Sequence, residues 1–282
     1  AAALYALGQV PQKFFPDSDR AQVLVYVDLP AGSSSRETDA TIRTLAAVAG
    51  DDERFPEVED SIAYVGFGGP RFVLSLTPVD PAPQRGFLVL NIDRYEHLGP
   101  AIEALRPAFA AAAPAAQVRV QGMFLGPSDS SVLEIQLKGP DAEHLYTRSR
   151  ELEALLVGLP RSINVRSDWE NRITRVHVKV DQARVRRAGV TSADVARALE
   201  SHFEGRRVTE FRDGDDVFPV VARAPAAARH DFERMKTIPV YAGATGRYVP
   251  LFQVATFELR NSFGVIAREA LTRTVSVQAR NT

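Results

Sequence analysis

The chain has 282 residues, 45% of them hydrophobic and 24% charged, and its 34 basic against 35 acidic side chains leave a net charge of -1. This length allows two or three compact units, and the balanced charge argues against a nucleic-acid-binding protein. The absence of cysteine excludes disulfides and thiolate metal sites. The sequence also lacks the run of about 18 apolar residues that a membrane span requires.

The first ten residues, AAALYALGQV, are apolar, yet they are too short to cross a bilayer and lack the basic region of a signal peptide. Two interpretations remain open from these residues alone. They are either the end of a longer helix or a disordered tail.

Residues 20–127 predict the order strand, helix, strand, strand, helix, strand. The stretch AQVLVYVDLP alternates in period two, and one of Ser33, Ser34 and Ser35 is placed to cap a helix that ends at Gly50. An extended piece follows from Val58 to Leu76. The order then repeats as GFLVLNIDR, HLGPAIEALRPAFAAAAP and AQVRVQGMFL. This is the ferredoxin-like, split βαβ order, with both helices on one face of an antiparallel sheet.

A second copy begins after residue 127 with a strand, SVLEIQLKGP, a helix from Ala142 to Leu159 and an extended stretch, INVRSDWENRITRVHVKVD. The pattern then breaks, because residues 182–205 are predicted helical, with Thr191 or Ser192 as a cap. Two strand pairs follow. The Asp-Gly of RDGD joins RRVTEF to DVFPVVARA, and GATG joins TIPVYAG to GRYVPLFQVA.

Only the last stretch, TRTVSVQARNT, supplies a strand that can pair back onto the second sheet. We therefore expect an α+β protein of two tandem ferredoxin-like subdomains, the second interrupted by a mixed α/β insertion and truncated at its C-terminus. The expected ranges are 20–127 for the first, 128–182 with 257–282 for the second, and 183–256 for the insertion. This interpretation requires Arg273–Gln278 to lie beside Leu133–Leu137.

Two strings carry a resemblance to the resistance-nodulation-division (RND) efflux transporters. KFFPDSDRAQVLVYVDLPAGSSSRETD resembles the segment after a transmembrane helix in these pumps, with FFP, a strand and a Pro-Ala-Gly turn. The more specific string, VRSDWENRITRVHVKVDQARVRRAGVTSADVARAL, resembles the run that opens their docking helix. The chain is similar to the periplasmic loop of these pumps over nearly its whole length, and SDR after FFP favours the C-terminal half. Residues 1–19 are then a membrane-helix end and an entry segment.

The resemblance implies the periplasmic domain of a bacterial inner-membrane pump of the multidrug type, which exports hydrophobic or amphiphilic small molecules. It implies a homotrimer that is driven by proton flow through membrane helices outside this sequence. Residues 183–256 would be a docking subdomain that meets a periplasmic adaptor and an outer-membrane channel. We expect no cofactor and no enzyme, since no acid, base and nucleophile converge. The alternative is a stand-alone periplasmic ligand-binding or adaptor module.

The stretch YVGFGGPRF is the first candidate site. Three glycines beside two phenylalanines give a loop that changes conformation at low steric cost while presenting aromatic surface. The resemblance places here a switch loop between substrate pockets, with these residues: Phe67, Gly68, Gly69, Arg71 and Phe72. The alternative is an ordinary strand irregularity, with both phenylalanines in the core and Arg71 on the surface.

The second candidate site lines the cleft that the resemblance places between the two subdomains. It comprises Phe124 at the end of the first sheet, and Arg166 and Asp168 on a strand of the second. Charged groups at a rim suit the recruitment of amphiphilic molecules. The alternatives are a solvated Arg166–Asp168 ion pair and, for Trp169, the only tryptophan, a packing role.

No metal site is expected, because the five histidines are scattered and the chain has only two methionines. Ser33–Ser35 lacks the Gly-x-Ser-x-Gly pattern of a nucleophile, and GFGGPR lacks the spacing of a dinucleotide fingerprint. The turns RDGDD and APAAARHD are candidate docking contacts in the insertion, or are simply solvated.

Overall fold

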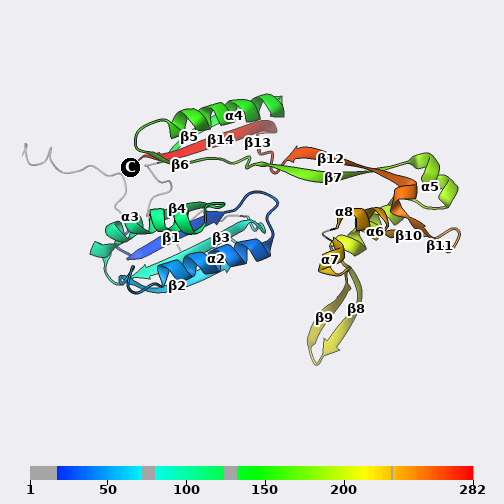
Figure 1. Ribbon diagram of the computed structural model, residues 1–282, viewed down its shortest axis with the longest axis horizontal. Coiled ribbons are helices and arrows are strands. Elements are labelled where there is room, and N and C mark those ends of the chain that lie inside the picture. The colour runs from blue at the N-terminus through cyan, green and yellow to red at the C-terminus, as the bar shows by residue number, and fades with distance from the viewer. Residues whose placement is uncertain (1–17, 72–79, 124–131, 230, 282) are drawn as a thin grey trace, which may run out of the picture. The chain divides into compact units, whose positions relative to one another are not determined.

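The computed structural model describes residues 18–71, 80–123, 132–229 and 231–281 (Figure 1). It divides into two compact units, residues 1–173 with 262–282, and residues 174–261. Helices and small antiparallel sheets make up both units, so the predicted α+β class is confirmed. Within these ranges no helix is both long and apolar enough to cross a membrane.

The first subdomain is a four-stranded antiparallel sheet with two helices on one face. Its elements, in chain order, are β1 (Gln22–Asp28), α2 (Ser35–Ala49), β2 (Val58–Val65), β3 (Arg85–Ile92), α3 (Tyr95–Ala112) and β4 (Gln117–Gly122). The strand order is β2-β3-β1-β4. Ser34 caps α2 and forms a capping box with Glu37, which selects one of the three serines proposed from the sequence.

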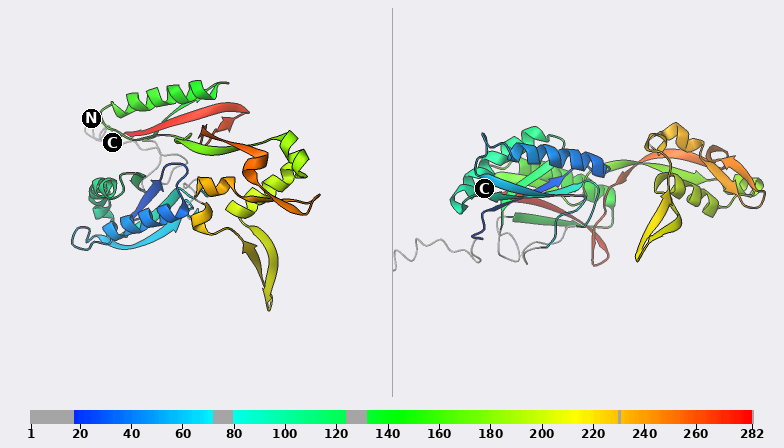
Figure 2. Two further views of the ribbon diagram at one scale, coloured as in Figure 1. Left: turned by 45° about the vertical axis from the view of Figure 1, so that its right-hand side comes forward. Right: turned by 90° about the horizontal axis from the view of Figure 1, so that it is seen from below.

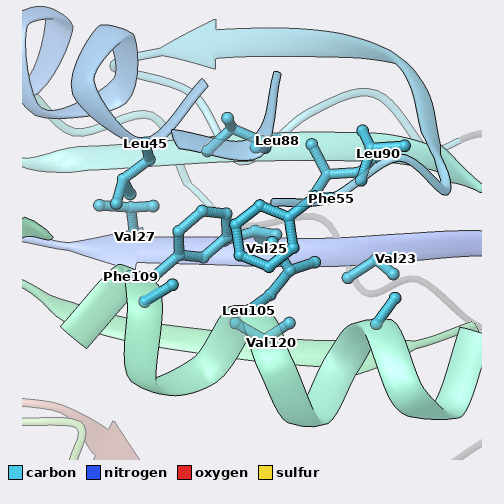
Figure 3. Packing of buried hydrophobic residues seen from close by; sticks show 14 of the residues in the cluster. Val23, Val25, Val27, Leu45, Phe55, Leu88, Leu90, Leu105, Phe109 and Val120 are labelled. Carbon is cyan, nitrogen blue, oxygen red and sulfur yellow. The ribbon is translucent and has the colours of Figure 1, made fainter. Parts of the chain in front are cut away.

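The core of the first subdomain lies between the sheet and its two helices. Val23, Val25 and Val27 point to this side of β1, and Leu105 and Phe109 of α3 pack onto them (Figure 3). The opposite face of β1 is also covered, because Leu24 is fully buried with Phe87 and Val89 of β3. A central strand that is buried on both faces explains the nearly continuous apolar run VLVYV.

The second subdomain is a smaller sheet under a single helix. It contains β5 (Val132–Lys138), α4 (Ala142–Val157), β6 (Ser162–Ser167), β13 (Arg268–Glu269) and β14 (Thr272–Asn281). The last strand, β14, lies between β5 and β6 and pairs Val275 with Leu137 and Ala279 with Leu133. The sequence prediction that the C-terminal strand returns to the start of the second copy is therefore confirmed.

The second unit begins and ends in a two-stranded ribbon of β7 (Arg172–Val180) and β12 (Ala255–Phe263). Its boundaries at 174 and 261 fall inside these strands, so most of the ribbon belongs to it. Between them lie α5 (Gln182–Ala188), α6 (Ser192–Phe203), β8 (Arg206–Asp213), β9 (Asp216–Ala222), α7 (Ala226–Arg229), α8 (Phe232–Lys236), β10 (Pro239–Ala242), β11 (Arg247–Pro250) and α9 (Leu251–Val254).

The helical stretch expected over residues 182–205 is two helices. Gly189 ends α5 in the left-handed conformation, with φ of 68°, and Thr191 caps α6 through a capping box with Asp194. The predicted Asp-Gly turn joins β8 to β9, which form a hairpin that extends away from the helices of this unit (Figure 2). Every residue of both strands is exposed.

Candidate functional site

A row of aromatic side chains crosses the first sheet on the face opposite its helices. Tyr64, Phe87 and Tyr26 are direct partners on β2, β3 and β1, and the register continues to Arg119 on β4. The ring centroids are 6.2 Å apart for Tyr64 and Phe87 and 4.9 Å for Phe87 and Tyr26. The guanidinium of Arg119 lies 4.7 Å from the centroid of Tyr26, in cation–π geometry.

The predicted switch loop joins the β2 end of this row. Phe67 is 38% exposed and packs edge-on to Tyr64, with 6.1 Å between the centroids. Gly69 is buried with φ of +80°, and a Cβ at this position would lie 2.7 Å from Cε1 of Phe87. Only glycine fits there, because the conformation disfavours a side chain and the ring of Phe87 occupies its place. The loop is therefore seated against the aromatic row.

The second sheet contributes a polar row. Arg166 on β6, Gln278 on β14 and Glu134 on β5 are register partners. Both Nε and Nη2 of Arg166 donate to Oε1 of Gln278, and Nε2 of Gln278 donates to Glu134 at 2.7 Å. Within the described residues Arg166 has no carboxylate in ion-pair contact. Burial, and then the nearby charge of Arg119, lower the pKa of Arg166 to about 10.

Asp168 does not pair with Arg166, so the proposed solvated ion pair is absent. Its Oδ1 accepts from the backbone N–H of Ser276 at 2.8 Å, and its own N–H donates to the Ser276 carbonyl. Burial raises the pKa of the Asp168 carboxyl. Asp168 therefore connects the end of β6 to β14 through two hydrogen bonds with Ser276.

Arg119 and Arg166, referred to below as the arginine pair, lie near each other, and a chain of ion pairs extends from Arg119. Arg119 Nη2 contacts Asp28 at 3.0 Å, Asp28 lies 3.9 Å from Nε of Arg85, and Nη2 of Arg85 contacts Glu170 at 3.1 Å. Tyr26, Arg119 and these ion pairs were not predicted from the sequence. The available signal was polar or aromatic residues at alternate positions of VYVD and QVRVQG, on strands whose other face is apolar.

Two of the predicted site residues, Phe72 and Phe124, lie outside the described residues, and Arg71 is exposed. Trp169 is fully buried against Leu145 and Val275, and its Nε1 donates to the carbonyl of Thr274 at 2.7 Å. Its role is the packing one that was the alternative.

In the ranges that the structure covers, no three histidine, aspartate or glutamate side chains gather as a metal ligand set. The two methionines pack in different clusters, Met123 beside Phe87 and Met235 in the second unit. The described arrangement is one of guanidinium groups beside aromatic rings.

Comparison with solved structures shows which known fold this chain shares. Two crystal forms of a heavy metal efflux pump match all of this chain, with TM-scores of 0.76 and 0.77. The sequence identity is 22% in both cases, and the match covers 29% and 30% of the pump chain. The fold of this chain is thus similar to a segment of that pump.

The family follows from the sequence. The model described as the AcrB/AcrD/AcrF family matches residues 1–282, and the chain belongs to this family of RND transporters. The resemblance seen in the sequence is thereby confirmed.

Curated relatives agree with this assignment. The cobalt-zinc-cadmium resistance protein CzcA of Cupriavidus metallidurans is 28% identical over 153 residues. The nickel and cobalt resistance protein CnrA of the same organism is 25% identical over 153 residues. Each match covers 53% of this chain and 14% of the relative.

Proposed function

We propose that this chain is the periplasmic porter and docking portion of a proton-driven RND pump in a bacterial inner membrane. The family match over the whole chain carries this proposal. The two subdomains of the first unit handle the substrate by changing their separation, and residues 183–256 form the docking subdomain. The complete pump acts as a trimer with an adaptor and an outer-membrane channel. No covalent step is involved.

The geometry best supports an organic amphiphile that carries an acidic group. The aromatic row offers apolar surface, and Arg119 and Arg166 offer two guanidinium groups. Arg85 and Arg119 take part in ion pairs with Asp28 and Glu170, whereas Arg166 lies near Glu134 without ion-pair contact to any described carboxylate. Because Arg166 is largely buried and lacks such a partner, an anion beside it is stabilised more strongly than at an exposed surface.

A divalent metal cation is the second candidate, favoured by the names of the relatives, which are cobalt, zinc, cadmium and nickel resistance proteins. Coulomb repulsion from two guanidinium groups disfavours a cation beside Arg166. A metal substrate would therefore bind elsewhere in the complete pump.

An export assay separates the two candidates. Cells that express the full-length transporter carrying Arg166→Gln or Arg119→Ala should accumulate an anionic amphiphilic dye while their resistance to zinc and cobalt is unchanged. Arg43→Gln, on an exposed arginine of α2, is the matched control and should export dye normally. A wild-type transporter that confers zinc and cobalt resistance but exports no anionic dye would instead support the cation pump.

The switch-loop hypothesis has its own test. Proline at Gly68 and Gly69 should impair export in the full-length protein without abolishing its expression, because Gly69 has φ of +80° and proline requires a negative φ. Gly99→Ala is the control, since nothing lies within 4 Å of its Cβ position. Normal export by the proline variant would remove the switch-loop idea.

The β8–β9 hairpin supports the docking role. A two-stranded hairpin is marginally stable alone in water, and here Phe211 and Phe218 face each other across it with 61% and 51% of their surface exposed. Contact with a partner protein would cover them. Phe211→Ser with Phe218→Ser should reduce co-purification of adaptor or channel with the pump, whereas Arg212→Ser, adjacent to Phe211, should not.

A further inference from the structure

The Pro-Ala-Gly turn after β1 meets the junction between β6 and β7. The backbone N–H of Ala31 donates to Oδ1 of Asn171 at 2.6 Å, and Nδ2 of Asn171 donates to the Ala31 carbonyl at 3.4 Å. One amide side chain thus pairs with both polar groups of one backbone residue. The first and second subdomains are joined here by a contact that is specific to the geometry of asparagine.

Glu170, the neighbour of Asn171, adds a charged contact. Its carboxylate accepts from Arg85 Nη2 at 3.1 Å and from Gln84 Nε2 at 3.2 Å, and only 20% of its side chain is exposed. Glu170 has φ of 53°, a conformation that is uncommon for a residue other than glycine. Such a conformation persists only where the surroundings hold it, and it often marks a functional position.

A third segment, the loop that contains Gly264, packs against the same junction. A Cβ at Gly264, in the loop between β12 and β13, would lie 3.0 Å from Cβ of Ala31 and 3.2 Å from the carbonyl oxygen of Asn171. Glycine here allows the chain to approach both residues closely. The Pro-Ala-Gly turn is therefore held between two loops of the second subdomain.

The junction is connected electrostatically to the arginine pair. Asp28 contacts Arg119 at 3.0 Å and lies 3.9 Å from Arg85, while Arg85 also contacts Glu170. An anion that binds Arg119 and Arg166 competes with Asp28 for Arg119. Asp28 then has only Arg85 as a partner, and it competes with Glu170 for that arginine.

We propose that Glu170 and Asn171 are positioning residues that form a latch between the two subdomains, and that an acidic substrate at Arg119 and Arg166 weakens this latch. The proposal rests on the proposed function, because it assumes transport by separation of the subdomains. A ligand shifts a conformational equilibrium only when it interacts differently with the two states. Asp28 supplies that difference, because its carboxylate lies near both Arg119 at the substrate site and Arg85 at the latch.

Disulfide locking tests the latch, and the chain has no cysteine of its own. Ala31→Cys with Gly264→Cys places two Cβ atoms about 3.0 Å apart, shorter than the roughly 3.5–4.5 Å of a disulfide, so the loop at residue 264 must move outward slightly for the bond to form. The oxidised full-length pump should lose export, and a reducing agent should restore it. Gln22→Cys with Asn91→Cys, register partners within the first sheet, is the matched control and should export in both states.

Normal export by the locked pump would overturn the latch. A wild-type pump that exports no anionic amphiphile would instead count against the proposed function, so the two failures are distinguishable.

The coupling has a readout besides transport. In the Ala31→Cys, Gly264→Cys pump, an anionic amphiphilic dye should slow cross-linking by about two- to fivefold, the range expected for one partly exposed ion pair. Glu170→Gln should slow it similarly without dye, and Arg119→Ala should abolish the effect of dye. A cross-linking rate that is changed neither by dye nor by Glu170→Gln would refute the coupling.

Discussion

The two subdomains of the first unit are built from the same opening elements but bury their strands differently. In the first, β1 lies between β3 and β4, and four of its seven residues are buried. In the second, its counterpart β5 pairs only with β14 among the described strands, and none of its residues is buried. The order β5-β14-β6 repeats β1-β3-β2. Burial is thus decided by neighbours, not by the strand sequence alone.

The helices show the same contrast. In the first subdomain α2 and α3 together cover the sheet, whereas α4 is the one helix on the described second sheet (Figure 1). Leu155 and Val157 of α4 remain 61% and 67% exposed, and Leu133 of β5 is 51% exposed. In the first subdomain, β4 and α3 cover the corresponding side. An exposed apolar surface of this kind is typical of a surface that another element or partner covers.

The largest expected effect is on stability, and it compares a buried leucine of the first subdomain with an exposed leucine of the second. Leu105→Ala, in the fully buried core of the first subdomain, should lower the free energy of unfolding by about 3 kcal/mol, through lost burial and a cavity. Leu155→Ala, the same change on exposed α4, should cost less than about 0.5 kcal/mol. Urea unfolding followed by circular dichroism measures both. Equal losses would show that α4 is covered in solution.

Trp169→Phe should have the next largest effect, a loss of about 1–3 kcal/mol, because the buried carbonyl of Thr274 loses its indole donor. The second subdomain has few other large buried side chains to compensate. Hydrogen exchange of β14 and α4 measures this loss locally. Protection that falls in the first subdomain instead would contradict the separate cores.

Gly69→Ala should cost about 1–2 kcal/mol, since φ of +80° and the ring of Phe87 both oppose a methyl group. Gly99→Ala, within α3, should be neutral or stabilising by up to about 1 kcal/mol. Thermal unfolding of the two variants provides the comparison. A neutral Gly69→Ala would mean that the loop leaves Phe87 in solution.

The smallest expected effect is that of Arg166→Met, a change of less than about 1 kcal/mol in the stabilising direction. The folded pKa of Arg166, about 10, is below the ordinary value of an arginine, so the fold disfavours the charged form. This unfavourable contribution is fully present below pH 10 and fades as the pH rises from there toward the ordinary pKa of the unfolded chain. A large destabilisation on urea unfolding would show that the charge holds the fold.

Much of the fold was predictable because its determinants are local. Alternating valines, the caps Ser34 and Thr191 and the Asp213–Asp216 turn are each set by a few adjacent residues. The interruption of the second copy followed from counting strands. The candidate site was only half predictable. Phe67, Gly69 and Arg166 came from the resemblance, whereas Tyr26 and Arg119 required the register between strands more than 90 residues apart along the chain.

The sequence by itself determined which residues form strands and helices, where two helices start, and that the last strand returns to an earlier one. Periodicity and capping are short-range properties, so they are visible in the chain. Only the tertiary structure decided that Tyr64, Phe87, Tyr26 and Arg119 form one row and that Arg166 lies near Arg119. Those contacts depend on strand register and on the packing of two sheets, because side chains distant in sequence meet only after both are set.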